Sequence, residues 1–135
     1  MTDGTTYTDL IRTAIQNRYT LLRYYYSAFW EIQESGGSFF KPLFFEFPKD
    51  SSAYYVIEKN MLLGNGLKAS IETTSLIDSE GVSFYFPNGT WCQVIPIIEY
   101  NYSNCIQTLV GENVTLRSHM KDYYVHARNG YIIPL

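Results

Sequence analysis

Two carboxylates near the middle of the chain are the first candidates for acid–base or nucleophilic chemistry. Glu46 stands near the end of the apolar run Phe39–Phe47, and Asp50 follows in the next polar segment. Hydrolysis by a pair of carboxyl groups needs them ~5 Å apart, or ~6.5–9.5 Å apart when a water lies between. Four extended residues separate Cα atoms by ~13 Å, unless a bend at Pro48 shortens the distance. We therefore expect structural roles, with Glu46 hydrogen-bonded to neighbouring strands and Asp50 forming the loop.

The histidines do not suggest a metal or nucleophile site. His119 and His126 are separated from each other and from both cysteines, and no pair has the spacing of zinc ligands. Alternation in the strand Tyr123–Arg128 predicts that His126 lies on a polar face. There is no glycine-rich phosphate loop and no G-x-S-x-G motif, so we expect neither cofactor nor metal. Trp30 and Trp91 are expected to pack rather than to stack on a sugar.

Composition indicates an ordinary globular chain. Of the 135 residues 46% are hydrophobic and 17% charged, and the net charge of −3 is unlike that of a nucleic-acid-binding protein. The 17% aromatic content fits a large aromatic core better than sugar-stacking platforms. No run reaches the ~18 apolar residues of a membrane span. The N-terminal residues MTDGTTYTD lack the features of a signal peptide.

Three sequons and two cysteines bear on the cellular compartment. Asn88, Asn101 and Asn113 each begin an N-x-S/T glycosylation triplet, and Asn88 falls in an expected tight turn. Cys92 and Cys105 could form a disulfide, but two unpaired core thiols fit the spacing nearly as well. If the chain belongs to a secretory protein, the signal is expected upstream of Met1.

The first third of the chain predicts a helix and then a buried strand. Thr6 and Asp9 stand in a capping relation, and apolar residues recur at helical spacing until the stop signal Gly36-Gly37. The amphipathic helix needs a surface to cover. The run Phe39–Phe47 is typical of a parallel strand with both faces buried, as in one turn of an α/β barrel.

The remainder predicts antiparallel β-structure. Asn88-Gly89 and Asn129-Gly130 are the dipeptides of tight hairpins, the first lying between Phe86 and Trp91. A boundary is expected near residue 60. The predicted strands are Leu67–Ile71, Val82–Phe86, Trp91–Ile98, Asn113–Arg117, Tyr123–Arg128 and Tyr131–Leu135.

Five phrases resemble, in order, the end of the catalytic region of glycoside hydrolase family 31, which contains the α-glucosidase and maltase type of enzymes. Together they cover roughly Ile11 to the C-terminus. They are Asn17–Ser27 (NRYTLLRYYYS, for RYxLLPYLY), Lys41–Asp50 (KPLFFEFPKD, for RPLFFEFPxD), Asn60–Gly64 (NMLLG, for QFLLG), Tyr85–Trp91 (YFPNGTW, for YFPxGxW) and Val125–Pro134 (VHARNGYIIP, for HVRGGYIIP).

The departures from these phrases indicate a divergent or relaxed copy. Arg23 stands where the family phrase has Pro, Lys41 replaces Arg, and Asn129 replaces Gly. Cys92-Gln93 replaces Tyr-Asp. Lys68 stands in a strand that is usually apolar, where a lysine is costly unless its amine reaches water or a partner.

The resemblance implies an α+β fold: residues 1–60 as the last helix and strand of a (β/α)8 barrel, and residues 61–135 as an antiparallel β-sandwich. In the family the catalytic aspartates, and a histidine that contacts the sugar, precede the RYxLL helix, and none of their motifs has a match here. Glu46 matches a position that is neither nucleophile nor acid. No catalytic residue is therefore assigned.

The resemblance predicts the C-terminal portion of a retaining α-glucosidase, with its oligosaccharide site in an upstream barrel and a lysosomal or extracellular location. The alternative is a short non-catalytic β-sandwich protein used for binding or assembly. In either case a partner should cover the apolar helix and strand.

Overall fold

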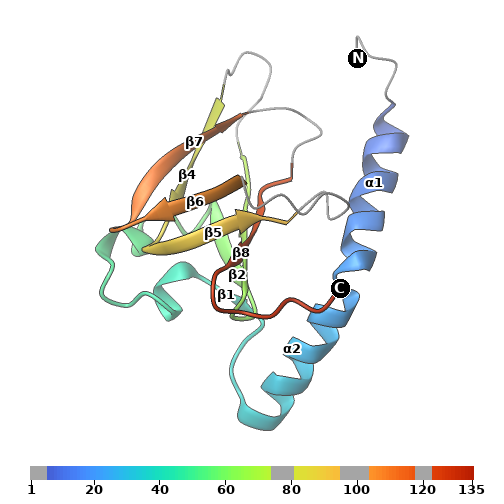
Figure 1. The fold of residues 1–135 in the computed structure, drawn as a ribbon, viewed down its shortest axis with the longest axis horizontal. Coiled ribbons are helices and arrows are strands. Elements are labelled where there is room, and N and C mark those ends of the chain that lie inside the picture. Colours follow the sequence, from blue (N-terminus) through green and yellow to red (C-terminus); the bar gives the residue numbers. More distant parts are fainter. Residues whose placement is uncertain (1–5, 74–80, 95–103, 118–122) are drawn as a thin grey trace.

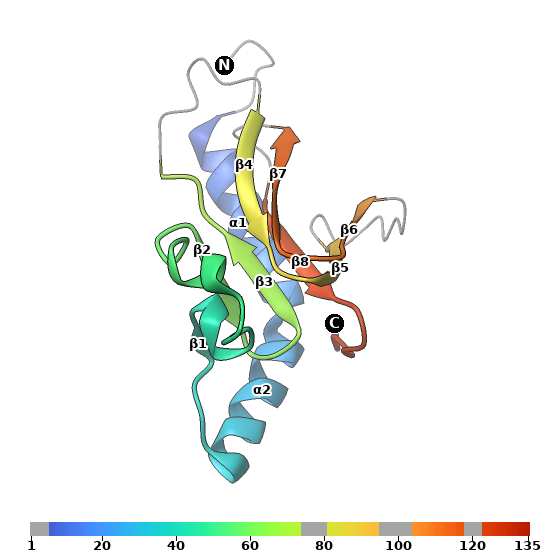
Figure 2. The same cartoon turned by 90° about the vertical axis from the view of Figure 1, so that its left-hand side faces the viewer.

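The computed structural model describes residues 6–73, 81–94, 104–117 and 123–135. Two helices stand along one side of two antiparallel sheets, so the expected α+β class is confirmed (Figure 1). The two-stranded sheet lies on the side of the molecule away from the helices, and a view from that side shows β4 and β7 in front of α1 (Figure 2). Neither helix is long and apolar enough to cross a membrane.

The single helix predicted from the sequence is divided in two. Helix α1 (Tyr7–Thr20) begins at the expected capping box, in which Thr6 and Asp9 bond reciprocally, and helix α2 (Leu22–Ser35) ends at Gly36. Leu21 separates the helices with φ −90° and ψ 3°, and its N–H bonds back to Arg18. Gly36 has a φ of 77°, which a glycine adopts without steric cost.

Among the described residues six strands form the main sheet and two form a second sheet, and each of their pairings is antiparallel. The main sheet has the order β1 (Phe40–Lys41), β2 (Asn60–Leu63), β3 (Leu67–Ser70), β8 (Val125–Arg128), β5 (Gly89–Gln93) and β6 (Cys105–Thr108). The second sheet pairs β4 (Gly81–Phe86) with β7 (Glu112–Arg117). Strands β2 and β6 were not predicted, and the predicted strand Trp91–Ile98 lies outside the described residues beyond Val94.

The predicted long parallel strand Phe39–Phe47 is wrong. Only β1 is extended, and it pairs antiparallel with β2; the 3-10 turn η1 (Leu43–Phe45) follows at once. Pro42 stands between them, and a proline has no N–H to continue a strand ladder. Phe40 and Phe45 are exposed, so the run is not buried on both faces. After Asp50 a second 3-10 turn, η2 (Ser51–Tyr54), leads towards β2.

Neither predicted hairpin forms. The turn around Asn88 carries the chain from the two-stranded sheet, where β4 pairs β7, into the main sheet, where β5 pairs β6 and β8. The Pro87 carbonyl accepts hydrogen bonds from Trp91 Nε1 (2.9 Å) and Thr108 Oγ1 (2.6 Å), which fixes this corner. After β8 the chain forms no further strand and returns to the helices, where Arg23 donates to the Leu135 carbonyl (2.6 Å).

The core consists of two clusters, one on each face of the main sheet. The first lies between α2 and the strands β2, β3 and β8; the second is centred on the fully buried Trp91 and lies under β4 and the 3-10 turns. Packing of Trp91 was expected, whereas Trp30 is exposed and the expectation that it packs is wrong for this chain. Both clusters combine residues from either side of residue 60, and the domain boundary there stays a prediction.

Helix α2 is held on the sheet by the hydroxyl of Tyr24. This hydroxyl donates to the Leu63 carbonyl (2.6 Å) and accepts from the Gly66 N–H (3.0 Å), so it bonds both sides of the β2–β3 turn. Gly64 has a φ of +61°, and a Cβ there would lie 2.7 Å from the Tyr24 hydroxyl. A glycine is therefore needed both for the turn and for the close approach of the helix.

We predict that Tyr24→Phe lowers the free energy of unfolding by about 1–3 kcal/mol, because it leaves a buried N–H and a carbonyl without their partner. Urea unfolding of the 135-residue chain measures the change. Tyr26→Phe is the matched control, since Tyr26 lies on the same helix with its side chain exposed. Equal midpoints for the two variants would contradict the role given to the Tyr24 hydroxyl.

Candidate functional site

Glu46 is at the centre of an ion cluster that joins the start of the main sheet to its middle. One carboxylate oxygen lies 2.8 Å from Lys41 Nζ, and the other lies 3.7 Å from Arg128 on β8. Lys41 also donates to the Asn65 side chain. The guanidinium of Arg128 lies over the ring of Phe47, 4.6 Å from its centroid. The cluster links β1 to β8 through Glu46, and the structural role expected for Glu46 stays a prediction.

Asp50 has separate partners. Its carboxylate caps the turn η2 by accepting from the Ser52 N–H (3.1 Å), and it accepts a hydrogen bond from the Tyr85 hydroxyl (2.5 Å). Burial and this bond to the carboxylate raise the pKa of Tyr85 to about 12. The contact ties the loop after η1 to strand β4. Glu46 and Asp50 thus act in two different contacts, and neither contact resembles a pair of carboxyl groups facing one reacting bond.

A groove of about 510 Å³ lies between the end of α2 and the β2–β3 turn. Its lining includes Glu31, Gly36, Lys41, Phe45 and Asn65. Glu31 is the one carboxylate among the described residues that line it, so this groove does not supply the two carboxyl groups of a glycosidase. Among the described residues there is also no group of three or more metal-ligating side chains. His119 lies outside them.

The predicted polar face of β8 is wrong, because His126 is buried. Its ring lies edge-on to Phe86, with 4.9 Å between ring centroids, and its exposed fraction is 1%. The predicted alternation itself is confirmed, because Ala127 lies on the opposite face of β8 from His126 and packs in the cluster under α2. Alternation in the strand does not show which face is covered, and here the second sheet covers the face of β8 that was expected to meet solvent. Burial, and then the neighbouring Lys68 charge, lower the pKa of His126 to about 3.

Lys68, the departure noted from the sequence, is fully buried next to His126 across the β3–β8 pair. Its amine donates to Asn60 Oδ1 (2.7 Å) and to the Ser70 hydroxyl, and it lies 4.1 Å from the centroid of the Phe86 ring. The amine therefore reaches partners, and those among the described residues are all uncharged. Burial lowers the pKa of Lys68 to about 7.

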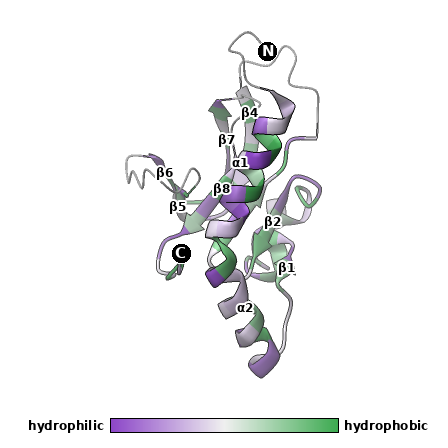
Figure 3. Cartoon of the chain, turned by 90° about the vertical axis from the view of Figure 1, so that its right-hand side faces the viewer, coloured by the Kyte–Doolittle hydropathy of each residue, from purple (hydrophilic) through white to green (hydrophobic). Residues whose placement is uncertain are grey.

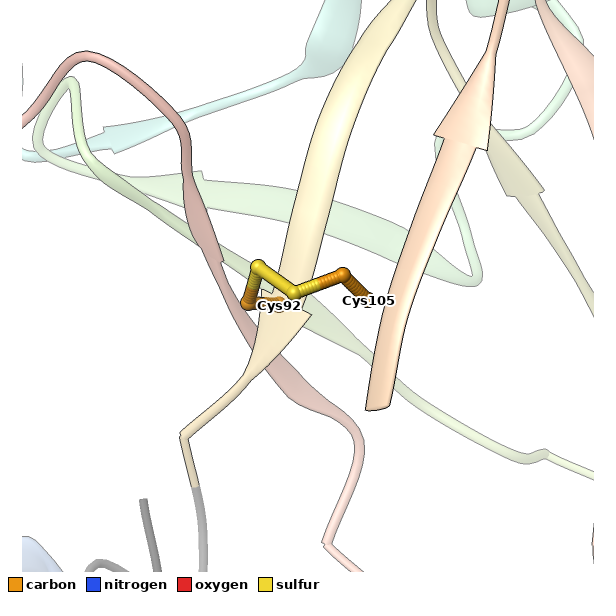
Figure 4. The surroundings of a disulfide bond; sticks show 2 residues. All are labelled: Cys92 and Cys105. Atoms are coloured by element: carbon orange, nitrogen blue, oxygen red, sulfur yellow. A yellow bond between two sulfur atoms is a disulfide. The ribbon is translucent and has the colours of Figure 1, made fainter. Parts of the chain in front are cut away.

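Cys92 and Cys105 are joined by a disulfide between β5 and β6 (Figure 4). The two residues are direct partners in the register of these strands, and no described cysteine is free. Strand β6 lies at the edge of the main sheet, so the disulfide anchors a strand that has one neighbour. The sequence had left this pairing and free thiols as alternatives.

The exposed faces of α1 and α2 form one apolar stripe. Its residues are three or four positions apart in the sequence. All are aromatic or aliphatic, yet their exposed fractions are 44–78%. Helix α1 buries none of its residues. Figure 3 shows the helices from this side, with hydrophobic residues among the hydrophilic ones. We call the set the helix stripe: Tyr7, Ile11, Ile15, Tyr19, Leu22, Tyr26 and Trp30.

The sequence predicted one amphipathic helix with a single apolar face to be covered, and the helix stripe shows that the helices carry a second apolar face. The residues that pack on the sheet are Leu21 at the junction and Tyr24 and Ala28 of α2, together with the half-buried Tyr25 and Ile32. The stripe lies on other positions of the same helices. The helices therefore have two apolar surfaces, one that covers this chain's sheet and one that remains exposed, which is the kind of surface that a protein partner covers.

Comparison with known proteins agrees with this architecture. The family model described as "Glycosyl hydrolase family 31 C-terminal domain" matches residues 36–133 of this chain. An α-glucosidase of Hordeum vulgare is 34% identical over 92% of this chain, and a lysosomal α-glucosidase of Bos taurus is 32% identical over 93%. The chain belongs to glycosyl hydrolase family 31 and corresponds to its C-terminal region. It spans 13% and 14% of the lengths of these two relatives.

The solved structures support the fold. A family 31 dextranase of Flavobacterium johnsoniae superposes with a TM-score of 0.76 over 96% of this chain and 15% of its own length. The sequence identity is 20%, so this comparison concerns the arrangement of helices and antiparallel sheets. A glucosidase II α subunit gives a TM-score of 0.77 over 94% of this chain.

We predict that Glu46→Gln lowers the free energy of unfolding by about 1–3 kcal/mol, because Lys41 and Arg128 lose the charge that both face. Chemical denaturation at constant pH measures the loss. Glu34→Gln on the exposed side of α2 is the control and should change little. If both variants unfold at the wild-type midpoint, the ion cluster does not hold β1 to β8.

We predict that Lys68 makes stability rise with pH. The unfolded chain keeps the lysine protonated up to about pH 10.5, whereas the folded chain releases the proton near pH 7. Between these values the unfolded state binds more protons, so the free energy of unfolding increases by up to about 1.4 kcal/mol per pH unit.

Lys68→Met should abolish this increase, as measured by denaturation between pH 7 and pH 10. Lys49→Met, which alters an exposed lysine, should retain the wild-type pH dependence. Parallel profiles for wild type and Lys68→Met would show that the Lys68 amine has the same proton affinity in both states.

Proposed function

We propose that this chain is the C-terminal part of a retaining α-glucosidase whose catalytic carboxylates lie in a (β/α)8 barrel region outside residues 1–135. The helix stripe is the observation that carries the proposal, because it leaves an aromatic and aliphatic surface without a partner on both helices. Family membership indicates what kind of partner to expect. The α-glucosidases of Hordeum vulgare and Bos taurus, which this chain matches over a small share of their length, support this choice.

In this proposal residues 1–60 complete the barrel and the β-structure that follows supports it. No residue of helix α1 is fully buried, and isolated helices shorter than ~12–15 residues are marginal in water. Covering the stripe with barrel helices would stabilise α1 by apolar burial. The ion cluster around Glu46 and the contact between Asp50 and Tyr85 would fix the barrel end to the sheets.

The parent reaction would be retaining hydrolysis of α-glucosidic bonds in oligosaccharides. One carboxylate of the barrel forms a glycosyl-enzyme and a second acts as acid and then as base. The name of the Bos taurus relative points to a lysosomal or related secretory route, and the Cys92–Cys105 disulfide agrees with an oxidising compartment. Carbohydrate metabolism is the proposed setting.

We predict that the 135-residue chain alone does not hydrolyse maltose or an aryl α-glucoside. Translating the gene in frame upstream of Met1 should give an aspartate-containing barrel region, and the longer protein should show turnover. An in-frame stop codon with a promoter directly upstream would contradict the proposal. Turnover by the short chain that is lost on changing Glu46→Gln would contradict it too, since the proposal gives Glu46 a structural role.

The helix stripe provides a second arm of the same test. In the longer protein, Ile15→Asp should lower activity and stability because it places a charge in the covered stripe. Gln16→Asp adds the same charge on a neighbouring exposed position outside the stripe and serves as the control. If the short chain is instead a stable monomer that unfolds cooperatively, the alternative of a non-catalytic binding or assembly module is favoured.

A further inference from the structure

One of the three sequons lies on a strand whose geometry suits a glycan. Asn113 and Thr115 are two residues apart on β7, so alternation directs both to the same face, and both are exposed. Val114 between them points the other way and packs against the second core cluster. The residue that would carry the sugar and the hydroxyl that defines the sequon therefore both face solvent, while the middle residue anchors the strand.

The amide of Asn113 is also unengaged. It makes no side-chain hydrogen bond with another residue in the described parts of the chain, and its partner across the β4–β7 pair is Tyr85. Ser83 and Thr115 face each other on the same surface and are exposed. On the Ser83 and Thr115 side the surface beside the amide is thus polar, while Tyr85 is buried and its hydroxyl is bonded to Asp50; a substituent on Asn113 Nδ2 would displace no side-chain hydrogen bond of the described residues.

Asn88 is in a different situation. Its Nδ2, the atom to which a glycan would be attached, donates to the Leu109 carbonyl at 2.6 Å. It also follows Pro87, whose carbonyl holds the corner through Trp91 and Thr108. A glycan there would crowd a corner on which the connection between the two sheets depends. Asn101 lies outside the described residues.

We infer that Asn113 is an N-glycosylation site of this protein and that Asn88 is not. The donor would be an oligosaccharide linked through a pyrophosphate to a lipid. A bond forms between Asn113 Nδ2 and the anomeric carbon, the bond from that carbon to the pyrophosphate oxygen breaks, and the amide proton leaves with the lipid pyrophosphate product. No oxidant or reductant takes part.

The position is compatible with the proposed partner surface. The β4–β7 sheet lies on the side of the molecule away from α1 and α2, so a glycan on Asn113 would extend away from the helix stripe (Figure 1). The inference rests on the secretory route included in the proposed function. Directing the chain into the secretory pathway by an added signal tests glycosylation by itself. A missing glycan would then contradict this inference, whereas missing hydrolase activity would concern the proposed function alone.

The test uses the 135-residue chain directed into the endoplasmic reticulum of cultured animal cells by a cleavable signal. Wild type should lose mass on treatment with peptide N-glycosidase, and peptide mass spectrometry should find aspartate in place of Asn113. Asn113→Gln and Thr115→Ala should lose the glycan at this site, whereas Thr115→Ser preserves the sequon and should retain it. Asn88→Gln should be modified like wild type.

Comparing Thr115→Ala with Thr115→Ser separates the loss of a glycan from a loss of folding, since both alter the same exposed side chain. An unmodified Asn113 in secreted wild-type protein would overturn the inference. So would a glycan on Asn88, or a Thr115→Ser variant that lacks the Asn113 glycan although it is secreted.

Discussion

The packing of α2 on the main sheet is the contact on which the arrangement of this chain depends. Leu21, Tyr24 and Ala28 are the buried residues of the two helices and their junction, and they close one face of β2, β3 and β8. Gly64 lets the helix approach closely enough for the Tyr24 hydroxyl to bond the turn, and Gly66 leaves room for Ile133 and Tyr131 of the C-terminal segment. Helix α1 is held by less: a hydrogen bond of 3.3 Å from the Tyr123 hydroxyl to the Leu10 carbonyl and its junction with α2 at Leu21.

The opposite face of the main sheet is closed by β4, and this second layer explains the buried polar residues. Lys68 and His126 point into a space bounded by Phe86, where solvent cannot hydrate a charge. A buried ammonium without a carboxylate is expensive, and Asn60 and Ser70 offset only part of the cost. Releasing the proton near neutral pH is the alternative open to the lysine, and His126 remains neutral for the same reason.

Local sequence signals predicted those features that depend on neighbouring residues. They failed for features that depend on segments far away in the chain. The Thr6–Asp9 capping box, the stop at Gly36 and most later strands could be predicted because each depends on neighbouring residues. The Asn88-Gly89 dipeptide predicted a turn but not that its two strands join different sheets. The burial of His126 could not be predicted, because it depends on a layer contributed by β4. The lysine at position 68, by contrast, was recognisable as unusual from the sequence.

The helix side and the β4–β7 side of the molecule differ in the polarity of their exposed side chains. On the helix side, removing the helix stripe from water would release free energy in proportion to the apolar area covered, and α1 needs such a contribution because none of its residues is fully buried in this chain. On the β4–β7 side, Ser83, Asn113 and Thr115 present polar groups that lose nothing by remaining hydrated. In the proposed longer protein this difference would favour an orientation with the helices against the barrel and Ser83, Asn113 and Thr115 facing water.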